Sequence, residues 1–311
     1  MIDVSIIIVN YNSSQYLKRC VKSIRDNCKA ATYEIIVVDN GSRDDEIREL
    51  RQLKGLIDAI VETNANRGFG SGNNTGARGS KGKYLLFLNP DTVVLNDIVS
   101  AFVKAWNEIP GVGMLGAHQL NEDLTPNHSH GTFKGHAPTA FLSSEIYQNV
   151  TKQLKEIIFG KRKSQRKLVT ENSRPVSIPI DPLPVDWING ACLFTSSEIY
   201  GYLGGFDERF FLFSEETDLQ LRLKERKLGR YLVSGPRVVH LHEDRRKMTN
   251  GTRINYYRGY FTYCKIWNSL PVYLATKFCF ILITIIGNAL DVITRRYTVA
   301  ENTAFLRSLC K

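Results

Sequence analysis

Short apolar runs alternate with helically spaced apolar residues along the N-terminal part of the chain. A continuous apolar run bounded by turn residues predicts a buried strand. Such runs are found at Val4–Val9, Glu34–Val38, Ile57–Glu62 and Tyr84–Leu88. Helices are predicted over Gln15–Asn27 and Glu46–Leu53, and a loop running into a further helix over Asn64–Gly82. Strands that alternate with helices predict an α/β fold with a parallel, doubly wound sheet.

Two of these predicted strands end in an acidic residue. Asp39 follows the second strand, and Asp91 follows the fourth in the turn Asn89-Pro90-Asp91-Thr92. Pro90 ends that strand because proline brings no N–H to the sheet. Open α/β sheets bind ligands at the carboxyl ends of their strands, where a carboxylate can hold a divalent cation against a diphosphate. A turn with a solvated aspartate is the competing interpretation of Asp91.

The segment Asn66–Asn74 is rich in glycine and asparagine. Glycines let a backbone approach a ligand closely, and asparagine side chains offer both donors and acceptors. The spacing matches neither a GxxxxGK[ST] loop nor a GxGxxG fingerprint, which excludes the two commonest phosphate-loop motifs. We therefore expect a ligand-binding loop here in preference to a flexible connection.

Acidic residues cluster in Ser214–Leu219, just after the segment Gly204–Phe211. Adjacent carboxylates in an aromatic setting can have raised pKa values, which suit a general base. The cluster is also typical of an acidic helix N-terminus capped by Ser214. Both interpretations can hold together, because a residue on the first turn of a helix can still face a cleft.

Patterning weakens between Asn121 and Asp181 and returns at Val185–Thr195. Further along, Tyr231–Val233 and Val238–His242 predict two short strands. The turn Ser234-Gly235-Pro236 separates them.

Charge and cysteine content narrow the class of protein. The formal charge of +10 suggests an anionic partner, which could be nucleic acid, anionic lipid or a phosphorylated substrate. The six cysteines lack CxxC or zinc-like spacing, so reduced thiols and no structural metal are expected. The start of the chain has neither the basic region nor the length of a signal peptide. A cytoplasmic enzyme body is therefore predicted.

Six motifs stand in the order found in family 2 glycosyltransferases. They are Ser5–Asn12, Val37–Ser42, Asn66–Asn74, Phe87–Thr92, Asp186–Ala191 and Gly204–Leu219. The set resembles the bacterial rhamnosyltransferase-like branch of that family, over about residues 3 to 260. The resemblance implies the GT-A fold, a Rossmann-like, mostly parallel sheet flanked by helices. It also implies transfer of a sugar from a nucleotide with inversion.

By position, the resemblance assigns the nucleotide sugar to residues in four of these motifs. They are Asn10, Tyr11, Asn12, Asp39, Asn66, Gly68, Asn73 and Asn89. Within this set, Asp39 matches the acid that reads the pyrimidine base. Asn89 stands where the DxD metal motif has its first acid, and an amide is a weaker cation ligand than a carboxylate.

A divalent cation, Mg²⁺ or Mn²⁺, is the cofactor that the resemblance implies. Asp91 matches the last acid of the metal motif, and His240 matches a histidine that often faces the metal or the diphosphate. His242 lies two residues further along a predicted strand and would share its face, so it remains an alternative. A lone strand histidine is also commonly a core residue.

Four residues match positions beside the donor sugar and the acceptor: Trp187, Asn189, Gly190 and Asp218. Glu216 matches the catalytic base, which is commonly the aspartate of a Glu-Asp pair. The pair in this chain is Glu-Glu, so Glu215 remains the alternative base.

The most hydrophobic block lies near the C-terminus. Phe278–Ile286 is apolar apart from Thr284, and the longer stretch Val272–Leu290 is marginal for a membrane span of about twenty residues. With Arg295-Arg296 and the basic stretch Lys155–Lys167, it predicts a helix lying in the cytoplasmic leaflet of an anionic membrane. A buried core helix or an oligomer helix is the alternative.

These expectations combine into one predicted function. Residues 1–120 would form the nucleotide-sugar-binding half, 121–260 the acceptor-binding and catalytic half, and 261–311 a helical, membrane-associating segment. The enzyme would be peripheral on the inner face of the plasma membrane. It would move a sugar, with rhamnose the first candidate, from a UDP- or dTDP-sugar to a lipid-linked oligosaccharide in surface polysaccharide or O-antigen synthesis. No nucleic acid partner is expected.

Two alternatives come from other classes of protein. One is a non-catalytic carbohydrate- or lipid-binding subunit with the same fold, which the acids Asp39, Asp91 and Glu216 disfavour. The other is a nucleotidyltransferase. That class needs a glycine-rich loop with Arg or Lys directly after the first strand, and Asn10–Ser14 is not such a loop.

Overall fold

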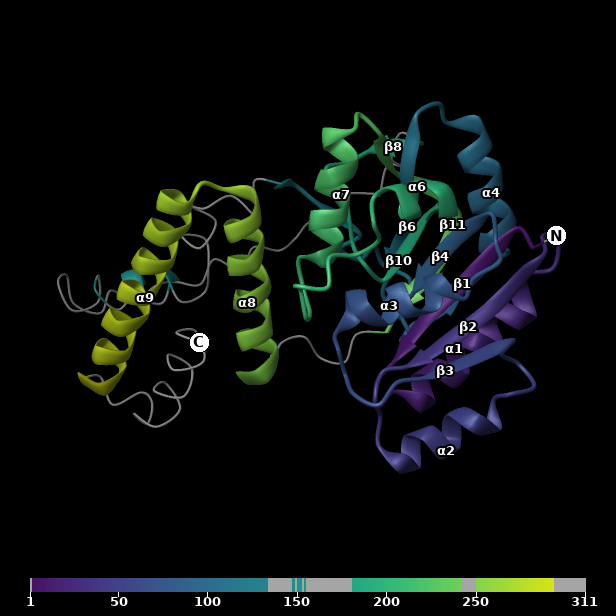
Figure 1. Cartoon of the computed structure of the whole chain (residues 1–311), viewed down its shortest axis with the longest axis horizontal. Coiled ribbons are helices and arrows are strands. Elements are labelled where there is room, and N and C mark those ends of the chain that lie inside the picture. Colours follow the sequence, from purple (N-terminus) through teal and green to yellow (C-terminus); the bar gives the residue numbers. More distant parts are fainter. Residues whose placement is uncertain are drawn as a thin grey trace. The chain divides into compact units, whose positions relative to one another are not determined.

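The computed structural model describes residues 2–133, 147, 148, 150–152, 154, 181–241 and 250–293 (Figure 1). The chain forms two compact units. One consists of Met1–Phe133 and Pro179–Lys247, and the other of Lys134–Ile178 and Met248–Lys311. Every residue predicted to bind the nucleotide sugar, the cation or the acceptor belongs to the first unit. The two halves predicted within residues 1–260 stay a prediction.

In the described part of the first unit, nine strands form one mixed sheet with the order β3-β2-β1-β4-β10-β6-β11-β5, and β8 pairs with β11. The strands are β1 (Val4–Asn10), β2 (Tyr33–Asp39), β3 (Ala59–Glu62), β4 (Tyr84–Leu88), β5 (Thr92–Val94), β6 (Val112–Leu120), β8 (Leu183–Pro184), β10 (Cys192–Ser196) and β11 (Gly229–His240). A separate pair joins β7 (His130–Gly131) and β9 (Trp187–Ile188).

The N-terminal half of the sheet is parallel, as predicted. β1 pairs in parallel with β2 and β4, and β2 pairs in parallel with β3. β10 then runs antiparallel between β4 and β6, and β5 is antiparallel to β11. The predicted α/β class, with a central sheet flanked by helices, is confirmed, and the C-terminal half of the sheet is mixed.

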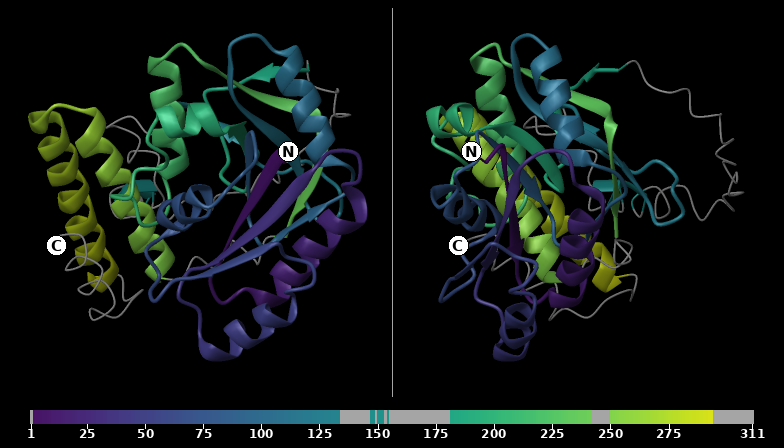
Figure 2. Two further views of the ribbon diagram at one scale, coloured as in Figure 1. Left: turned by 45° about the vertical axis from the view of Figure 1, so that its right-hand side comes forward. Right: turned by 90° about the vertical axis from the view of Figure 1, so that its right-hand side faces the viewer.

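Helices cover both faces of this sheet (Figure 2). Ile6 and Ile8 on β1 pack into one cluster, while Ile7 between them packs into the other. The first cluster includes residues of α1 (Ser14–Asn27), α2 (Asp44–Gln52) and α4 (Ile98–Glu108); the second includes residues of α3 (Phe69–Arg78), α6 (Ser197–Tyr202) and α7 (Glu215–Glu225). A strand that is buried on both faces has a continuous apolar sequence, which is why these strands could be predicted from the sequence.

One expectation for the sheet was wrong. Tyr231–Val233 and Val238–His240 are two halves of the single strand β11, which pairs with β6 along both. The register shifts between Val233 and Arg237, so the Gly-Pro turn signal becomes an irregularity within the strand. Extra residues can be absorbed in this way without ending a strand. His242 lies outside the described residues.

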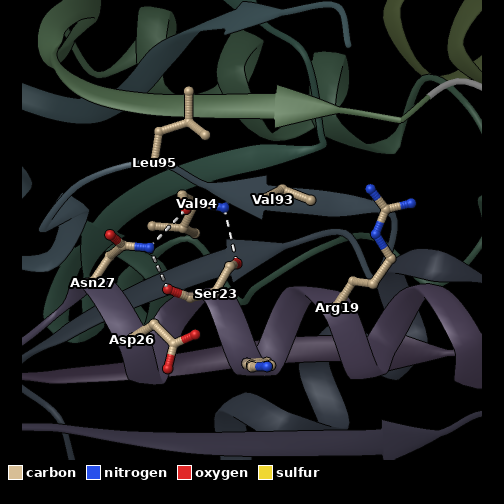
Figure 3. A pocket seen from close by; sticks show the side chains of 8 residues that line it. Arg19, Ser23, Asp26, Asn27, Val93, Val94 and Leu95 are labelled. Atoms are coloured by element: carbon tan, nitrogen blue, oxygen red, sulfur yellow. Dashed lines mark hydrogen bonds between the residues drawn. The ribbon is translucent and has the colours of Figure 1, made fainter.

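The short edge strand β5 is covered by α1. Ser23 Oγ accepts a hydrogen bond from Val94 N–H (2.9 Å), and Asn27 Nδ2 donates to the Val94 carbonyl (3.1 Å), as Figure 3 shows. These bonds give partners to the main-chain N–H and carbonyl of Val94 in this edge strand. The hollow beside them is lined by residues of α1 and of Val93–Leu95, and none of the predicted site residues lines it.

The described part of the second unit contains the long helices α8 (Asn250–Trp267) and α9 (Leu270–Ile293). Phe280 of α9 packs against the rings of Tyr257 and Phe261 of α8, with centroids 4.6 and 5.2 Å apart. By length and composition, Leu270–Gly287 could cross a membrane; its mean hydropathy is 1.9, and 22% of it is buried. Seven large apolar residues in the described part of α9 are exposed. They are Leu270, Val272, Leu274, Phe278, Leu282, Ile285 and Ile286.

Candidate active site

The first cluster of predicted site residues lies at the carboxyl ends of β1 and β2. Asn10 is the register partner of Asp39, and its Nδ2 donates to Asp39 Oδ1 at 3.1 Å. The Ser42 N–H donates to Asp39 Oδ2 at 3.0 Å. Asp39 is fully buried, whereas Tyr11 is 47% exposed. A nucleobase could therefore reach the Asp39 carboxylate only if a neighbouring side chain moved aside.

The turn after β1 is held by Ser42 of the turn after β2. Asn12 has a left-handed backbone (φ 50°), and its N–H donates to Ser42 Oγ at 2.9 Å. The side chain of Asn12 accepts from Arg43 N–H at 3.0 Å. The two predicted nucleotide-contacting turns are thus hydrogen-bonded to each other.

Asn40, which the sequence reasoning did not single out as a site residue, connects the end of β2 to the Gly/Asn-rich loop. Its Nδ2 donates to Asn66 Oδ1 (3.1 Å) and to the Gly68 carbonyl (3.0 Å). Gly68 has φ +95°, and a Cβ there would lie 2.1 Å from the carbonyl oxygen of Phe211. Only glycine therefore fits this close approach. The signal for Asn40 was its place beside Asp39 in the Asp-Asn-Gly-Ser motif.

The two asparagines of α3 differ in what they bind. Asn73 is buried, and its Nδ2 donates within the helix to the Phe69 carbonyl (3.0 Å). The side chain of Asn74 instead binds the main chain of Phe206: its Oδ1 accepts from Phe206 N–H, and its Nδ2 donates to the Phe206 carbonyl, each at 2.9 Å. Its Nδ2 also donates to Glu208 Oε1 at 2.9 Å. α3 is thereby fixed to the segment that precedes the acidic helix α7.

Asp91 and His240 are brought together by the pairing of β5 with β11. His240 is the register partner of Thr92, and the Leu241 N–H donates to the Asp91 carbonyl at 2.8 Å. His240 Nε2 then lies 3.2 Å from Asp91 Oδ1. The imidazole is buried, whereas the Asp91 side chain is 32% exposed and so is open to a ligand.

These residues fit a divalent cation. Asp91 Oδ1 and the neighbouring Asn89 Oδ1 are buried atoms that accept no hydrogen bond from the described residues. In the described part of the chain, no three His, Cys, Asp or Glu side chains converge, so protein atoms alone make an incomplete shell. Mg²⁺ is commonly bound in that way, by one or two carboxylates together with substrate phosphates and water.

The acidic helix begins at Glu215, after Ser214 in a left-handed conformation (φ 71°). Ser214 occupies the N-cap position, but its side chain makes no capping hydrogen bond, so the expected serine cap is only positional. Glu215 is 3% exposed, whereas Glu216 is half-buried. A Cβ at Gly190 would lie 3.7 Å from Glu216 Cβ, so Glu216 packs against the segment predicted to hold the acceptor.

Burial sets the protonation of the two glutamates. It raises the pKa of Glu215 well above its ordinary value, and the charge of Glu216 raises it further. Burial also raises the pKa of Glu216, while main-chain N–H groups at the helix start oppose that rise. The pKa of the more deeply buried Glu215 is raised more strongly than that of Glu216, so Glu216 is the first of the two to ionise.

Gln220 is a buried residue that the sequence reasoning missed. Its Oε1 accepts from Ile188 N–H (2.7 Å), and its Nε2 donates to the Ile188 carbonyl (2.8 Å) and to the Glu216 carbonyl (3.0 Å). It therefore fixes β9, which contains Trp187, against the helix that carries Glu216. The one sequence feature that could have identified Gln220 is its position a single helical turn after Glu216.

The other residues predicted to lie beside the acceptor make hydrogen bonds with main-chain groups. Trp187 Nε1 donates to the Thr132 carbonyl at 3.2 Å, and the Asn189 N–H donates to the Ser129 carbonyl at 2.8 Å. The Asn89 N–H donates to the Ala191 carbonyl at 3.0 Å. That bond joins the turn that contains Asp91 to the segment that contacts Glu216.

Asp218 makes its ion pair with an arginine of the same helix. Its buried carboxylate forms an ion pair with the partly exposed Arg222 (2.8 Å), which also donates to the carbonyls of Leu203 and Gly205 at 2.6 and 2.9 Å. Its carboxylate therefore holds the Gly-Gly turn before α7. Its predicted contact with the sugars stays a prediction.

The fold is shared with a solved transferase. The chain aligns with a crystal structure of GalNAc-T7 with UDP, GalNAc and Mn²⁺ at a TM-score of 0.60 and 16% identity, covering 86% of this chain and 48% of that one. At this identity the likeness defines the fold, which is that of the GT-A glycosyltransferases.

Sequence comparison gives the family. The model of glycosyl transferase family 2 matches residues 5–169. The chain belongs to glycosyl transferase family 2 and is a glycosyltransferase, as its motifs predicted.

Two relatives align over most of the chain. A hexosyltransferase of low-salt glycan biosynthesis from Haloferax volcanii is 25% identical over 73% of this chain, which spans 63% of that protein. An N-acetylglucosaminyl-diphospho-decaprenol L-rhamnosyltransferase from Mycobacterium tuberculosis is 25% identical, over 76% of this chain and 75% of its own length.

Proposed function

We propose that this protein is an inverting glycosyltransferase that moves a sugar, with rhamnose the first candidate, from a UDP- or dTDP-sugar to a lipid-linked glycan. The observation that carries the proposal is the hydrogen bond from Asn89 to Ala191. It joins the Asp91–His240 pair, which could hold a cation against a diphosphate, to the segment in contact with Glu216, which could accept a proton. The sugar and acceptor are proposed because a similar protein is an L-rhamnosyltransferase acting on a diphospho-decaprenol.

Glu216 is the proposed base. Its carboxylate accepts the proton of the acceptor hydroxyl while that oxygen forms a bond to the anomeric carbon. The bond from that carbon to the diphosphate oxygen breaks on the opposite face, so the configuration inverts and the nucleoside diphosphate leaves with the electron pair. No covalent intermediate is needed, because positioned groups lower the barrier of the direct displacement.

Asp91 and His240 are the proposed cation-binding residues, with Asn89 beside them. A bound Mg²⁺ or Mn²⁺ would neutralise charge on the diphosphate. The buried turns around Asp39, Asn40 and Asn66 are proposed to bind the nucleoside. Trp187 and Asn189, fixed through β9, are proposed to orient the acceptor.

A transfer assay tests this function. The full-length protein is incubated with Mn²⁺, dTDP-rhamnose or a UDP-hexose, and a short-chain polyprenyl-diphosphate-linked N-acetylglucosamine. A disaccharide product whose new anomeric centre is inverted, seen by NMR, supports the proposal. Nucleotide-sugar binding without transfer or hydrolysis across the panel would instead favour the non-catalytic subunit.

Nucleotide preference follows from the place of Asp39. A carboxylate accepts a hydrogen bond from the N3–H of uracil or thymine, and cytosine and purines lack that donor at the matching position. We expect UDP and dTDP to bind at least about ten-fold more tightly than CDP and GDP, since one hydrogen bond to a charged group contributes roughly 1.5–3 kcal/mol. Isothermal titration measures this. Tighter binding of GDP than of both pyrimidine nucleotides would overturn the assignment of Asp39.

We propose that the exposed apolar face of α9 lies in a membrane. Leu274, Phe278 and Leu282 recur every four residues, which places them on one side of the helix. The opposite side, with Phe280, packs on α8. Insertion of the exposed side into lipid would remove its apolar residues from water and leave the packing on α8 unchanged. It would also bring the enzyme close to a lipid-linked acceptor. Peripheral attachment to the inner leaflet is the proposed arrangement.

Vesicle binding tests this arrangement. Phe278→Glu should weaken co-sedimentation with phosphatidylglycerol vesicles roughly ten- to hundred-fold, since burial of a phenylalanine side chain contributes about 1.5–3 kcal/mol. High salt should weaken but not abolish binding, because it screens charge and leaves apolar contacts intact. Tyr202→Glu, at a 70% exposed position of α6, is the matched control. Wild-type binding by Phe278→Glu would place the anchor elsewhere, and a lowered melting temperature would favour a core helix.

A further inference from the structure

Gln119 lies behind the Asp91–His240 pair, near the end of β6, and is 1% exposed. Its Oε1 is 3.2 Å from His240 Nδ1. Its Nε2 is buried and has no hydrogen-bond partner among the described residues. The three side chains therefore make two successive contacts, from Gln119 to the imidazole and from the imidazole to Asp91, whose Oδ1 is 3.2 Å from His240 Nε2.

The amide of Gln119 decides which ring nitrogen carries the proton. A neutral imidazole has one N–H and one lone pair. When Gln119 presents Oε1, Nδ1–H donates to it, and the Nε2 lone pair faces Asp91 Oδ1. These two acceptors repel each other unless a cation binds between them, so this arrangement favours cation binding. When the amide turns over, its N–H donates to Nδ1, and the proton on Nε2 donates to Asp91.

We propose that Gln119 is a positioning residue that sets the tautomer of His240, so that Nε2 faces the cation site beside Asp91. Rotation of one amide supports both the cation-bound and the cation-free arrangement. A histidine that binds a metal usually donates its other N–H to an acceptor of this kind, which orients the ring. The inference rests on the proposed role of Asp91 and His240.

The main chain holds Gln119 in place for this role. Its N–H donates to Ser129 Oγ (2.7 Å), and its carbonyl accepts from Asn127 N–H (2.8 Å). Ser129 in turn accepts from Asn189 N–H, in the proposed acceptor segment. The main chain of Gln119 is therefore held at both its N–H and its carbonyl, and its side chain is buried.

Manganese binding tests the proposal without reliance on turnover. The signal of free Mn²⁺ in electron paramagnetic resonance is titrated against the full-length protein with saturating UDP. Gln119→Met keeps the length of the side chain and removes its hydrogen bonds, and should weaken Mn²⁺ binding about 10- to 100-fold. Gln119→Glu keeps only the acceptor and should bind Mn²⁺ at least as tightly as the wild type. Gln52→Met makes the same change at an exposed site and should have no effect.

A second readout follows the tautomer itself. With Mg²⁺ and UDP, ¹⁵N NMR of the histidines should show His240 protonated on Nδ1 in the wild type and in Gln119→Glu. Proton placement on Nε2 in both would overturn the proposal.

Asp91→Asn separates the failure of this inference from that of the proposed cation site. Weaker Mn²⁺ binding in Asp91→Asn but unchanged binding in Gln119→Met would overturn the role of Gln119 alone. Unchanged binding in both would overturn the cation site. If Gln119→Met does not fold, Gln119→Glu decides, because weakened binding in that folded variant contradicts the proposal.

Discussion

Glu216→Gln should lower turnover by roughly two to four powers of ten, the usual contribution of general-base catalysis. The amide keeps the shape of the side chain and its place beside Gly190 but cannot accept the acceptor proton. Nucleotide binding should survive, because the Asp39 and Asp91 turns are unchanged. Transfer rates at saturating substrates, with UDP binding measured by titration, check both expectations.

Two controls sharpen this result. Glu225→Gln, at the exposed end of α7, should leave turnover unchanged. Glu215→Gln should cost less turnover than Glu216→Gln, because burial and the charge of Glu216 raise the pKa of Glu215 and so favour its protonated form. A larger loss at Glu215 than at Glu216 would exchange their roles.

The pH dependence of turnover follows from the same geometry. Burial raises the pKa of Glu216, and the base works only when it is deprotonated. The turnover rate should therefore be at its maximum above that raised pKa and should fall as the pH is lowered through it. This fall should occur at a higher pH than the pKa of an exposed glutamate would give. Glu216→Gln should lose this acid limb. An acid limb that persists in the variant would belong to another group.

Asp91→Asn should weaken binding of the nucleotide sugar in Mn²⁺ about 10- to 100-fold. The loss of one charged ligand accounts for roughly 1.5–3 kcal/mol. In EDTA the variant and the wild type should bind alike, because the carboxylate acts through the cation. Titrations of UDP with Mn²⁺ and with EDTA measure the difference.

Asp26→Asn, an exposed change of the same chemistry on α1, is the control for Asp91 and should alter neither titration. An equal loss for Asp91→Asn in Mn²⁺ and in EDTA would show that Asp91 is structural. In that event its contact with His240 would serve only to join β5 to β11.

The sequence predicted the N-terminal half of the sheet and the ends of its strands. β1, β2 and β4 are buried on both faces, so each is a continuous apolar run, and a polar turn follows each run. The placement of Asp39 and Asp91 at strand ends follows from the same local signals. Six motifs in order were also enough to predict the family, which the family model confirms.

Contacts between distant segments were decided only by the tertiary structure. The antiparallel insertion of β10 and the continuity of β11 depend on which strands become neighbours, and a local turn signal at Gly235-Pro236 cannot reveal that. The closeness of Asp91 and His240 depends on the register of β5 against β11.

The sequence by itself thus determined the candidate acids, because their residue types and turn positions are local properties. The resemblance favoured Glu216 as the base and left Glu215 as the alternative, but the sequence could not show that Glu215 is the more deeply buried of the two, because burial is decided by the fold. The sequence reasoning also missed Gln119 and Gln220, whose amides look like any other polar residue until the fold buries them. Both then pair with groups far along the chain, because a buried amide must find hydrogen-bond partners wherever the tertiary structure supplies them.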